Sequence, residues 1–400
     1  MRFDRHGDTQ LTTEMSTPLF HELQVRRIEA DTSEAVIVSF DVPPELREVF
    51  GFTQGQYLTL RKQIDGQDLR RSYSICAGVD DGELRVGVRK VKGGAFSNWI
   101  NERLRPGDSL SVMAPQGRFF VPLDAAARRH HVGIAGGSGI TPILSIMKTV
   151  LAREPLSRFT LIYGNRTLRS TMFKEELEDL KNQHMARLVL HHVFSDDPTD
   201  RVGPPLASLA PPEGVLSGLG AARRQDAPLN TGLTDRAKIT EFLTGVVRAA
   251  SIDHAYICGP FQMNDEAEAA LLAAGVAEER IHIERFGLAP QAGGAVMHQA
   301  QPGDADNARI VIIRDGMRRE IAFRKNQPSI LDAASAAGLE VPFSCTSGVC
   351  GTCRAKLVEG QVRMERNFAL DRAEVAGGFV LTCQAHPLTD RVVLSFDERS

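Results

Sequence analysis

The chain has 400 residues, of which 42% are hydrophobic and 24% charged, enough for two or three domains that each bury their own core. The formal net charge is −3 with both signs interspersed, which argues against an extended basic face and against nucleic acid as a partner. No run of about eighteen uncharged apolar residues occurs, and residues 1–15 lack the order of a secretory signal, so we expect a cytoplasmic protein without a membrane segment.

The first expected domain covers residues 17–124. Short β-rich runs alternate there with Gly, Pro and Asp turns, which is the pattern of a small antiparallel β-barrel. Within it, residues 71–74 read Arg-Ser-Tyr-Ser and offer a guanidinium for a pyrophosphate, a ring to stack on a flavin, and hydroxyls for its polar edge. Taken alone, four residues of this composition are as often an ordinary edge strand.

The second half of this candidate flavin site follows one strand later. Residues 88–97 lead from Val-Arg into a Gly-Gly-Ala-Phe-Ser run, where small residues opening a helix leave N–H groups free to cradle a phosphate. The order of the two motifs predicts an FAD site. Its candidate residues are Arg71, Ser72, Tyr73, Ser74, Val88, Arg89, Gly94, Ala95, Phe96 and Ser97.

Residues 125–290 are expected to form a parallel α/β domain, since apolar strands alternate there with amphipathic segments. In residues 136–142, glycines lie between a strand and a helix, where a dinucleotide pyrophosphate can approach the backbone, although tight packing alone would also explain them. Residues 258–260, Cys-Gly-Pro, end a later strand at the same carboxyl edge of the sheet. Cys258 is therefore either a nicotinamide-pocket residue or a buried small hydrophobe.

Two stretches of biased composition interrupt the pattern. Residues 198–234, within the α/β region, are rich in Pro, Gly and Ala and predict a long surface insertion. Residues 291–307 are expected to be a linker, and residues 308–400 a last domain.

Four of the six cysteines lie in this last domain, with the spacing C-x4-C-x2-C and a fourth cysteine after twenty-nine residues. This spacing is typical of a plant-type 2Fe-2S cluster. A structural zinc site is the alternative, but zinc sites favour two C-x2-C pairs and only one is present. The strand–turn–strand pattern and the helix that precede the loop predict an α+β domain of the β-grasp ferredoxin type. The candidate ligands are Cys345, Cys350, Cys353 and Cys383.

The three motifs, in this order, resemble the ferredoxin–NADP reductase superfamily in the form that carries a C-terminal plant-type ferredoxin, over nearly the whole chain. Stretches such as GGAFSNWI and VLTCQAHPLTDRVVLSFD are most similar to the reductase subunits of phenylacetyl-CoA epoxidases. The resemblance implies an oxidoreductase that takes electrons from NAD(P)H through FAD and the cluster to a di-iron oxygenase in aerobic phenylacetate degradation. The alternatives are a reductase for a ring-hydroxylating or other oxygenase, and a non-enzymatic redox sensor.

The resemblance also implies roles for individual residues. Arg71, Tyr73 and Ser74 would hold the flavin, and Asn165 and Arg166 would receive the adenosine ribose. A positive Arg166 favours a 2′-phosphate and hence NADPH, with NADH as the alternative. The expected dinucleotide contacts are Gly137, Ser138, Gly139, Thr141, Cys258, Gly259 and Pro260. Phe286 is expected near the flavin ring, and the residues expected at the hydride-transfer gap are Cys258, Tyr73, Ser74 and Glu284.

Overall fold

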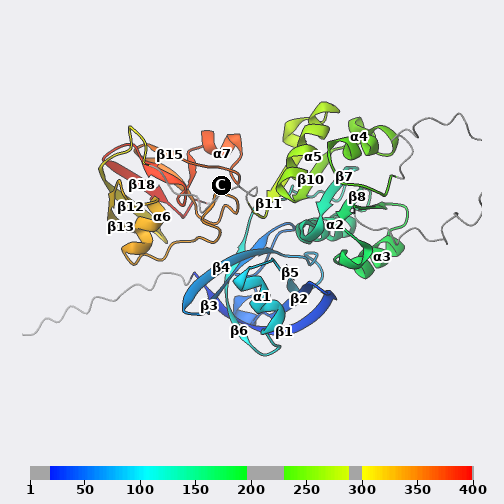
Figure 1. The fold of residues 1–400 in the computed structure, drawn as a ribbon, viewed down its shortest axis with the longest axis horizontal. Helices are drawn as coiled ribbons and strands as arrows, with labels where there is room; N and C mark the ends of the chain where they lie inside the picture. Colours follow the sequence, from blue (N-terminus) through cyan, green and yellow to red (C-terminus); the bar gives the residue numbers. More distant parts are fainter. Residues whose placement is uncertain (1–18, 196–228, 288–299, 399–400) are drawn as a thin grey trace, which may run out of the picture.

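The computed structural model describes residues 19–195, 229–287 and 300–398. Three sheets follow one another along the chain, coloured blue to cyan, cyan to green, and yellow to red in Figure 1. Residues 198–228 of the insertion expected at 198–234 lie outside the described residues. The same holds for residues 291–299 of the linker expected at 291–307.

The first sheet is antiparallel and has six strands in the order β4-β3-β6-β1-β2-β5. An isolated bridge between Ile75 and Val86 links its two ends, and buried Leu, Val, Ile and Phe side chains fill its interior, so the expected barrel is confirmed. Helix α1 packs on β5 and β3. The elements are β1 (His21–Thr32), β2 (Ala35–Asp41), η1 (Pro44–Leu46), β3 (Tyr57–Ile64), β4 (Gln67–Ser74), β5 (Leu84–Arg89), α1 (Ala95–Glu102) and β6 (Ser109–Gln116).

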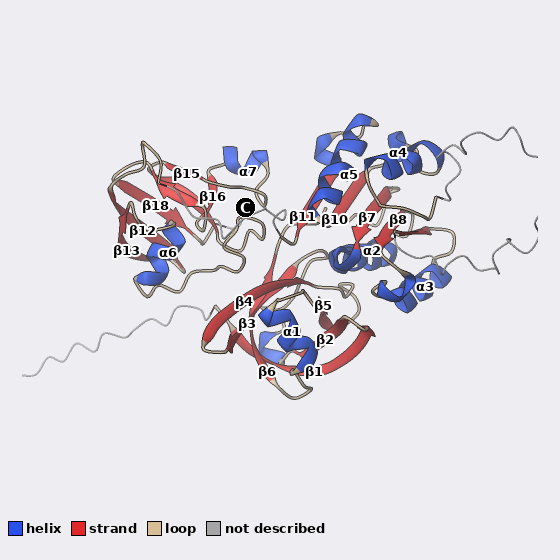
Figure 2. Ribbon diagram, viewed as in Figure 1, coloured by secondary structure: helices blue, strands red, loops and turns tan. Residues whose placement is uncertain are grey.

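The second sheet has five parallel strands in the order β11-β10-β7-β8-β9, which confirms the α/β prediction. Helices α2 and α3 cover one face and α4 and α5 the other (Figure 2). The elements are β7 (His130–Gly136), η2 (Gly137–Gly139), α2 (Ile140–Arg153), β8 (Arg158–Asn165), η3 (Leu168–Ser170), α3 (Lys174–Gln183), β9 (Leu188–Phe194), α4 (Arg236–Gly245), η6 (Ala249–Ser251), β10 (His254–Gly259), α5 (Phe261–Ala273), η7 (Glu278–Arg280) and β11 (Ile281–Arg285).

The strand order of this parallel sheet reverses beside β7. From β7 the chain moves outward through β8 to β9, then returns to place β10 and β11 on the other side of β7. Ligands of open α/β sheets bind at such a reversal, at the carboxyl ends of the strands. The topology thus brings the glycine turn after β7 next to the Cys-Gly-Pro end of β10.

The third sheet has five strands in the order β13-β12-β18-β14-β16, with β12 and β18 parallel, and the short strands β15 and β17 form a separate pair. Helix α6 packs against β13 over a common apolar core, which is the predicted β-grasp arrangement. The elements are β12 (Asn307–Arg314), β13 (Met317–Arg324), α6 (Ile330–Ala336), β14 (Arg354–Glu359), β15 (Val362–Met364), α7 (Arg372–Ala376), β16 (Phe379–Leu381), β17 (Ala385–Pro387) and β18 (Arg391–Ser395).

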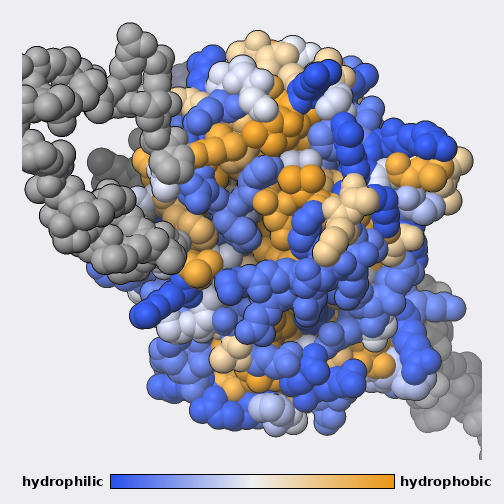
Figure 3. All heavy atoms as spheres, turned by 90° about the vertical axis from the view of Figure 1, so that its right-hand side faces the viewer, coloured by the Kyte–Doolittle hydropathy of each residue, from blue (hydrophilic) through white to orange (hydrophobic). Residues whose placement is uncertain are grey.

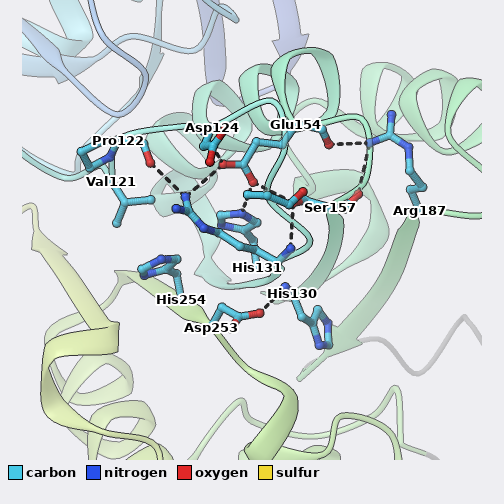
Figure 4. A network of polar contacts seen from close by, with 12 residues as sticks. Val121, Pro122, Asp124, His130, His131, Glu154, Ser157, Arg187, Asp253 and His254 are labelled. Atoms are coloured by element: carbon cyan, nitrogen blue, oxygen red, sulfur yellow. Dashed lines mark hydrogen bonds and ion pairs between the residues drawn. The ribbon is translucent and has the colours of Figure 1, made fainter.

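A buried acid ties the segment between barrel and parallel sheet to the sheet's amino-terminal edge (Figure 4). The fully buried Glu154 carboxylate accepts hydrogen bonds from Asp124 N–H, Arg129 Nη1 and His131 Nε2, each at 3.0 Å. Ser157 Oγ donates to the same carboxylate at 2.7 Å. Four donors thus converge on one group, as a buried charge requires.

Figure 3 shows the side of the molecule that lies on the right in Figure 1. Hydrophobic residues are set there among hydrophilic ones. Exposed apolar side chains of the parallel-sheet domain include Met185, Val189, Leu233 and Val246. In the part of the chain that the structure describes, no helix is both long and apolar enough to cross a bilayer.

Candidate functional site

The glycine turn after β7 lies directly against the end of β10. A Cβ at position 139 would lie 2.0 Å from the Cys258 carbonyl oxygen, so only glycine fits there. Gly137 has φ +52°, a conformation that glycine adopts without strain. The turn η2 runs directly into α2, and the Ile140 N–H bonds the carbonyl oxygens of Gly137 and Ser138. Gly136 caps η2 without a side-chain hydrogen bond, so the first N–H groups of η2 lack a partner from that cap and can face an anion. The turn therefore fits a dinucleotide pyrophosphate.

The other residues expected around the dinucleotide take different positions. Thr141 is buried, and its hydroxyl donates to the Ser138 carbonyl oxygen at 3.0 Å, so it shapes the turn from within. Gly259 lies against Met263, whose Cε would be 2.4 Å from an added Cβ, and Pro260 is the N-cap of α5.

Three charged residues meet beside the same turn. Arg89 lies close to Gly137, since a Cβ there would be 3.0 Å from Arg89 Nη1. Arg89 Nη2 bonds Glu34 Oε2 at 3.0 Å, and Arg166 Nη2 lies 3.7 Å from the same oxygen. Arg89, predicted to contact the flavin, therefore also lies beside the dinucleotide turn. Asn165 is buried at the end of β8.

Arg166 also borders a surface cavity of about 290 Å³. Apart from the carboxylate of Glu34, the wall of the cavity is formed mainly by hydroxyl and guanidinium groups. Such groups suit an anionic ligand. The lining residues are Thr32, Ser33, Glu34, Arg166, Thr167, Arg169 and Ser170.

Three residues from the expected hydride-transfer gap converge between the barrel and the parallel sheet. Ser74 Oγ, at the end of β4, donates to Glu284 Oε2 at 2.9 Å. Glu284 pairs in register with Cys258, which is fully buried, and Glu284 is partly buried. Burial raises the pKa of Glu284 to about 8, while the hydrogen bond from Ser74 lowers it less. The carboxyl group thus holds a proton at neutral pH. Burial, with the nearby Glu284, also raises the pKa of the Cys258 thiol well above its usual value.

The remaining flavin candidates spread along the barrel. The Tyr73 ring lies 6.2 Å from the buried Phe96 ring, and Arg71 is exposed, with Nη1 donating to the Arg70 carbonyl oxygen. Ser72 Oγ instead donates to Ser344 Oγ of the ferredoxin domain at 3.0 Å. Val88 is buried in the barrel core, and Phe286, 45% exposed, follows β11.

The turn before α1 fits a phosphate group. Gly93 has φ +74°, and Gly94 caps α1 without a side-chain hydrogen bond, so the first N–H groups of the helix lack a partner from that cap. Ala95 begins the helix and is exposed, while Ser97 is buried and accepts a hydrogen bond from the Val91 N–H at 3.2 Å. This turn and the Ser74–Glu284 contact are the features that fit FAD.

The four cysteines of the last domain are free thiols arranged as two pairs. Cys345 contacts Cys350, and Cys353 contacts Cys383; contact with Cys350 lowers the pKa of Cys345. Among the described residues, no three His, Cys, Asp or Glu side chains surround a single ion. Two pairs of thiols are the donor set that a two-iron cluster uses, with two cysteines on each iron.

The backbone of the cysteine loop is shaped for close approach to sulfur. Gly348 and Gly351 have φ of +81° and +69°, and the Ser347 N–H donates to Cys345 Sγ at 3.5 Å. Gln384 Nε2 lies 3.6 Å from Cys383 Sγ. Hydrogen bonds to sulfur tune an iron–sulfur cluster, so the loop fits the group that its spacing predicts.

Sequence reasoning missed two residues that the fold brings to this region. Tyr57 of the barrel contacts the cysteine loop, and Asn264 Nδ2 donates to the Glu284 carbonyl oxygen at 3.2 Å. Neither lies in a recognisable motif, and Tyr57 is separated from its partner Cys350 by 293 positions. No signal along the sequence could have indicated this pairing.

Three family models match consecutive parts of the chain. They describe an oxidoreductase FAD-binding domain (residues 22–121), an oxidoreductase NAD-binding domain (134–205) and a 2Fe-2S iron-sulfur cluster binding domain (312–388). FAD, a pyridine nucleotide and a 2Fe-2S cluster are thus the groups of this chain, as predicted.

Several proteins are similar over nearly the full length. The E subunit of the 1,2-phenylacetyl-CoA epoxidase from Escherichia coli K12 is 40% identical over 95% of this chain and 98% of the relative. The ferredoxin reductase component of 3-ketosteroid-9-alpha-monooxygenase from Mycolicibacterium smegmatis is 33% identical over 94% and 97%. The structure of phthalate dioxygenase reductase, 23% identical with a TM-score of 0.51, covers 94% of this chain and 98% of its own and shares the fold.

Proposed function

Because the chain belongs to the family of ferredoxin reductase components that join FAD-binding, NAD-binding and 2Fe-2S domains, we propose that it supplies electrons from NADPH to the di-iron oxygenase of a 1,2-phenylacetyl-CoA epoxidase. That it is an oxidoreductase serving an oxygenase follows from the family. The choice of oxygenase is supported by the 40% identity to the relative from Escherichia coli over 98% of that protein's length.

One feature of the fold carries the electron-transfer part of the proposal. Ser74, proposed for the flavin, bonds Glu284, which pairs with Cys258, and Tyr57 beside Ser74 contacts the cysteine loop at Cys350, so the residues proposed for the three sites lie close together where the domains join. When bound, FAD accepts two electrons together and releases them one at a time, which links a nicotinamide to a one-electron cluster. Close packing of the three sites is what such a relay requires.

The protein's own residues position the groups and control water and protons. Ser74 holds the Glu284 carboxyl, which keeps a proton at neutral pH in the expected hydride-transfer gap. Cys258, fully buried and uncharged, helps to exclude water from the same gap. Gly139 allows the turn to approach β10 closely enough to form the nucleotide site. The cluster would be held by Cys345, Cys350, Cys353 and Cys383.

The flavin and nucleotide contacts would come from the motifs named above. For FAD these are Arg71, Ser72, Tyr73, Ser74, Val88, Arg89, Gly94, Ala95, Phe96, Ser97 and Phe286. For the nucleotide these are Gly137, Ser138, Gly139, Thr141, Asn165, Arg166, Cys258, Gly259 and Pro260, with Arg89 beside the turn.

NADPH is the proposed coenzyme because Arg166 and Arg169 line the cavity next to the nucleotide turn. The test is anaerobic titration of the full chain with NADPH and with NADH, in wild type and Arg166→Ala. A charged hydrogen bond to phosphate is worth about 1.5–3 kcal/mol, so the preference for NADPH should fall about ten- to hundredfold in the variant.

Arg153→Ala serves as the matched control, because Arg153 is also an exposed arginine in an ion pair, with Asp80. Its coenzyme preference should equal that of wild type. An equal affinity of the wild-type chain for NADH and NADPH, unchanged in Arg166→Ala, would refute the coenzyme assignment.

The partner is tested by mixing the holoprotein with the oxygenase subunits of a 1,2-phenylacetyl-CoA epoxidase and measuring epoxide formation per NADPH oxidised. We expect coupled turnover there and little with a ring-hydroxylating oxygenase. The similarity to 3-ketosteroid-9-alpha-monooxygenase components favours a different oxygenase as the second candidate, and coupling only to such an enzyme would select it.

A further inference from the structure

Tyr57, the first residue of β3, connects the barrel to the cysteine loop of the ferredoxin domain. Its hydroxyl donates to the Cys350 carbonyl oxygen at 2.5 Å and lies 2.9 Å from Thr352 Oγ1. A phenol has one hydrogen to donate, and here it goes to Cys350, so Thr352 donates in the second contact. Tyr57 is only 6% exposed and its contact with Thr352 is buried, while the bond to Cys350 is partly buried.

The surrounding backbone leaves Tyr57 little freedom. Gly117 has φ +109°, and a Cβ there would lie 3.0 Å from both Cδ1 and Cε1 of the tyrosine ring. Tyr57 also pairs in register with Ser74, so the two side chains leave the sheet on the same face. One end of this strand pair therefore contacts Glu284 through Ser74 and the cysteine loop through Tyr57.

Other contacts between the barrel domain and the ferredoxin domain reach segments before and after the loop. After it, Arg118 forms an ion pair with Glu374 of α7; the remaining ones reach the segment before it. Ser72 bonds Ser344, and the Arg70 guanidinium lies 4.0 Å from the centre of the Phe343 ring. An ion pair between Arg61 and Glu340 is partly exposed and therefore contributes little. Among these contacts, the Tyr57 hydroxyl is the one that reaches a residue predicted to ligate the cluster.

We propose that Tyr57 is a positioning residue for electron transfer, whose hydroxyl fixes the Cys350 segment of the loop against the barrel. The inference rests on the proposed function, since it concerns the step from flavin to cluster. Only one electron moves in that step, and no bond forms or breaks. Hydrogen bonds around a cluster's ligands set their orientation and tune its potential, so the same hydroxyl affects both the placement and the potential of the cluster.

The test compares Tyr57→Phe with Tyr256→Phe in the full, cofactor-loaded chain. Each variant keeps the ring and loses one buried hydroxyl, and the Tyr256 hydroxyl contacts His131 at 3.2 Å, away from the cysteine loop. Hydrogen exchange of residues 345–353 should be about tenfold faster in Tyr57→Phe, because one hydrogen bond is worth roughly 1.4 kcal/mol. Tyr256→Phe should match wild type.

Two further measurements separate positioning from general destabilisation. An anaerobic redox titration followed by electron paramagnetic resonance should show a shifted midpoint potential for the cluster in Tyr57→Phe only. Stopped-flow traces with NADPH should show flavin reduction at the wild-type rate and slower cluster reduction in the same variant.

Unchanged exchange of residues 345–353 together with an unchanged cluster potential in Tyr57→Phe would overturn the proposal. Failure of the proposed function is distinguishable, because the wild-type chain itself would then not reduce its cluster with NADPH. Exchange that is faster throughout the chain in Tyr57→Phe would also overturn it, since the hydroxyl would then serve stability in general.

Discussion

Glu284 gives the sharpest prediction, because a buried acid with a raised pKa makes folding depend on pH. Its pKa is raised from 4.5 to about 8 by burial. Below about pH 4.5 both the folded and the unfolded chain carry the proton, so the residue does not lower the free energy of unfolding. Between about pH 4.5 and 8 only the unfolded chain releases it, and the free energy of unfolding falls as pH rises. Above about pH 8 both states have released the proton, so the loss in free energy of unfolding stays constant.

The magnitude follows from the pKa difference. At about 1.4 kcal/mol for each pH unit, the change from 4.5 to about 8 corresponds to an upper limit of about 5 kcal/mol. Glu284 is only partly buried, so solvent reduces the free-energy cost. We expect about 2–3 kcal/mol across this pH range.

Glu284→Gln removes the titrating proton and keeps the shape. Denaturant unfolding of the full chain, at pH values from 4 to 9, should show the variant gaining about 2–3 kcal/mol over wild type as pH rises to 8. Glu278→Gln, at an exposed glutamate in the same domain, should follow the wild-type curve. Parallel curves for wild type and Glu284→Gln would refute a proton held on Glu284 at neutral pH.

Two further substitutions test the nucleotide turn and the buried acid network. In Gly139→Ala a Cβ would lie 2.0 Å from the Cys258 carbonyl oxygen, so the turn must move. The rate of flavin reduction by NADPH should fall about a hundredfold, and a wild-type rate would contradict the close approach of the turn to β10. Glu154→Ala leaves Arg129 and His131 without their buried acceptor, so the free energy of unfolding measured with denaturant should fall by about 3–5 kcal/mol. A fall of less than about 1 kcal/mol would show that the network relaxes around the substitution.

The architecture could be predicted because its signals are local. Short β-rich runs separated by turns indicated the barrel, and apolar strands alternating with amphipathic segments indicated the parallel sheet. Glycine between a strand and a helix indicated the turn at 136–142. The spacing of Cys345, Cys350 and Cys353 indicated the cluster, because three ligands in one short loop reflect the size of the group they bind.

Contacts between domains could not be predicted in the same way. Arg89 is predicted to contact the flavin from its position before the glycine pair, and the packing of barrel against sheet also brings it to Gly137 and Glu34, which the sequence did not indicate. Nothing in the run around Tyr57 distinguishes it from an ordinary strand residue.

By itself the sequence determined which groups the chain uses and which segments fold into which sheets, since periodicity and ligand spacing act over a few residues. Only the tertiary structure decided how the sites face one another. Ser74 meets Glu284 and Tyr57 meets Cys350 across 210 and 293 positions, and such pairs form only when separately folded domains pack together. The burial that raises the pKa of Glu284 arises from the same packing.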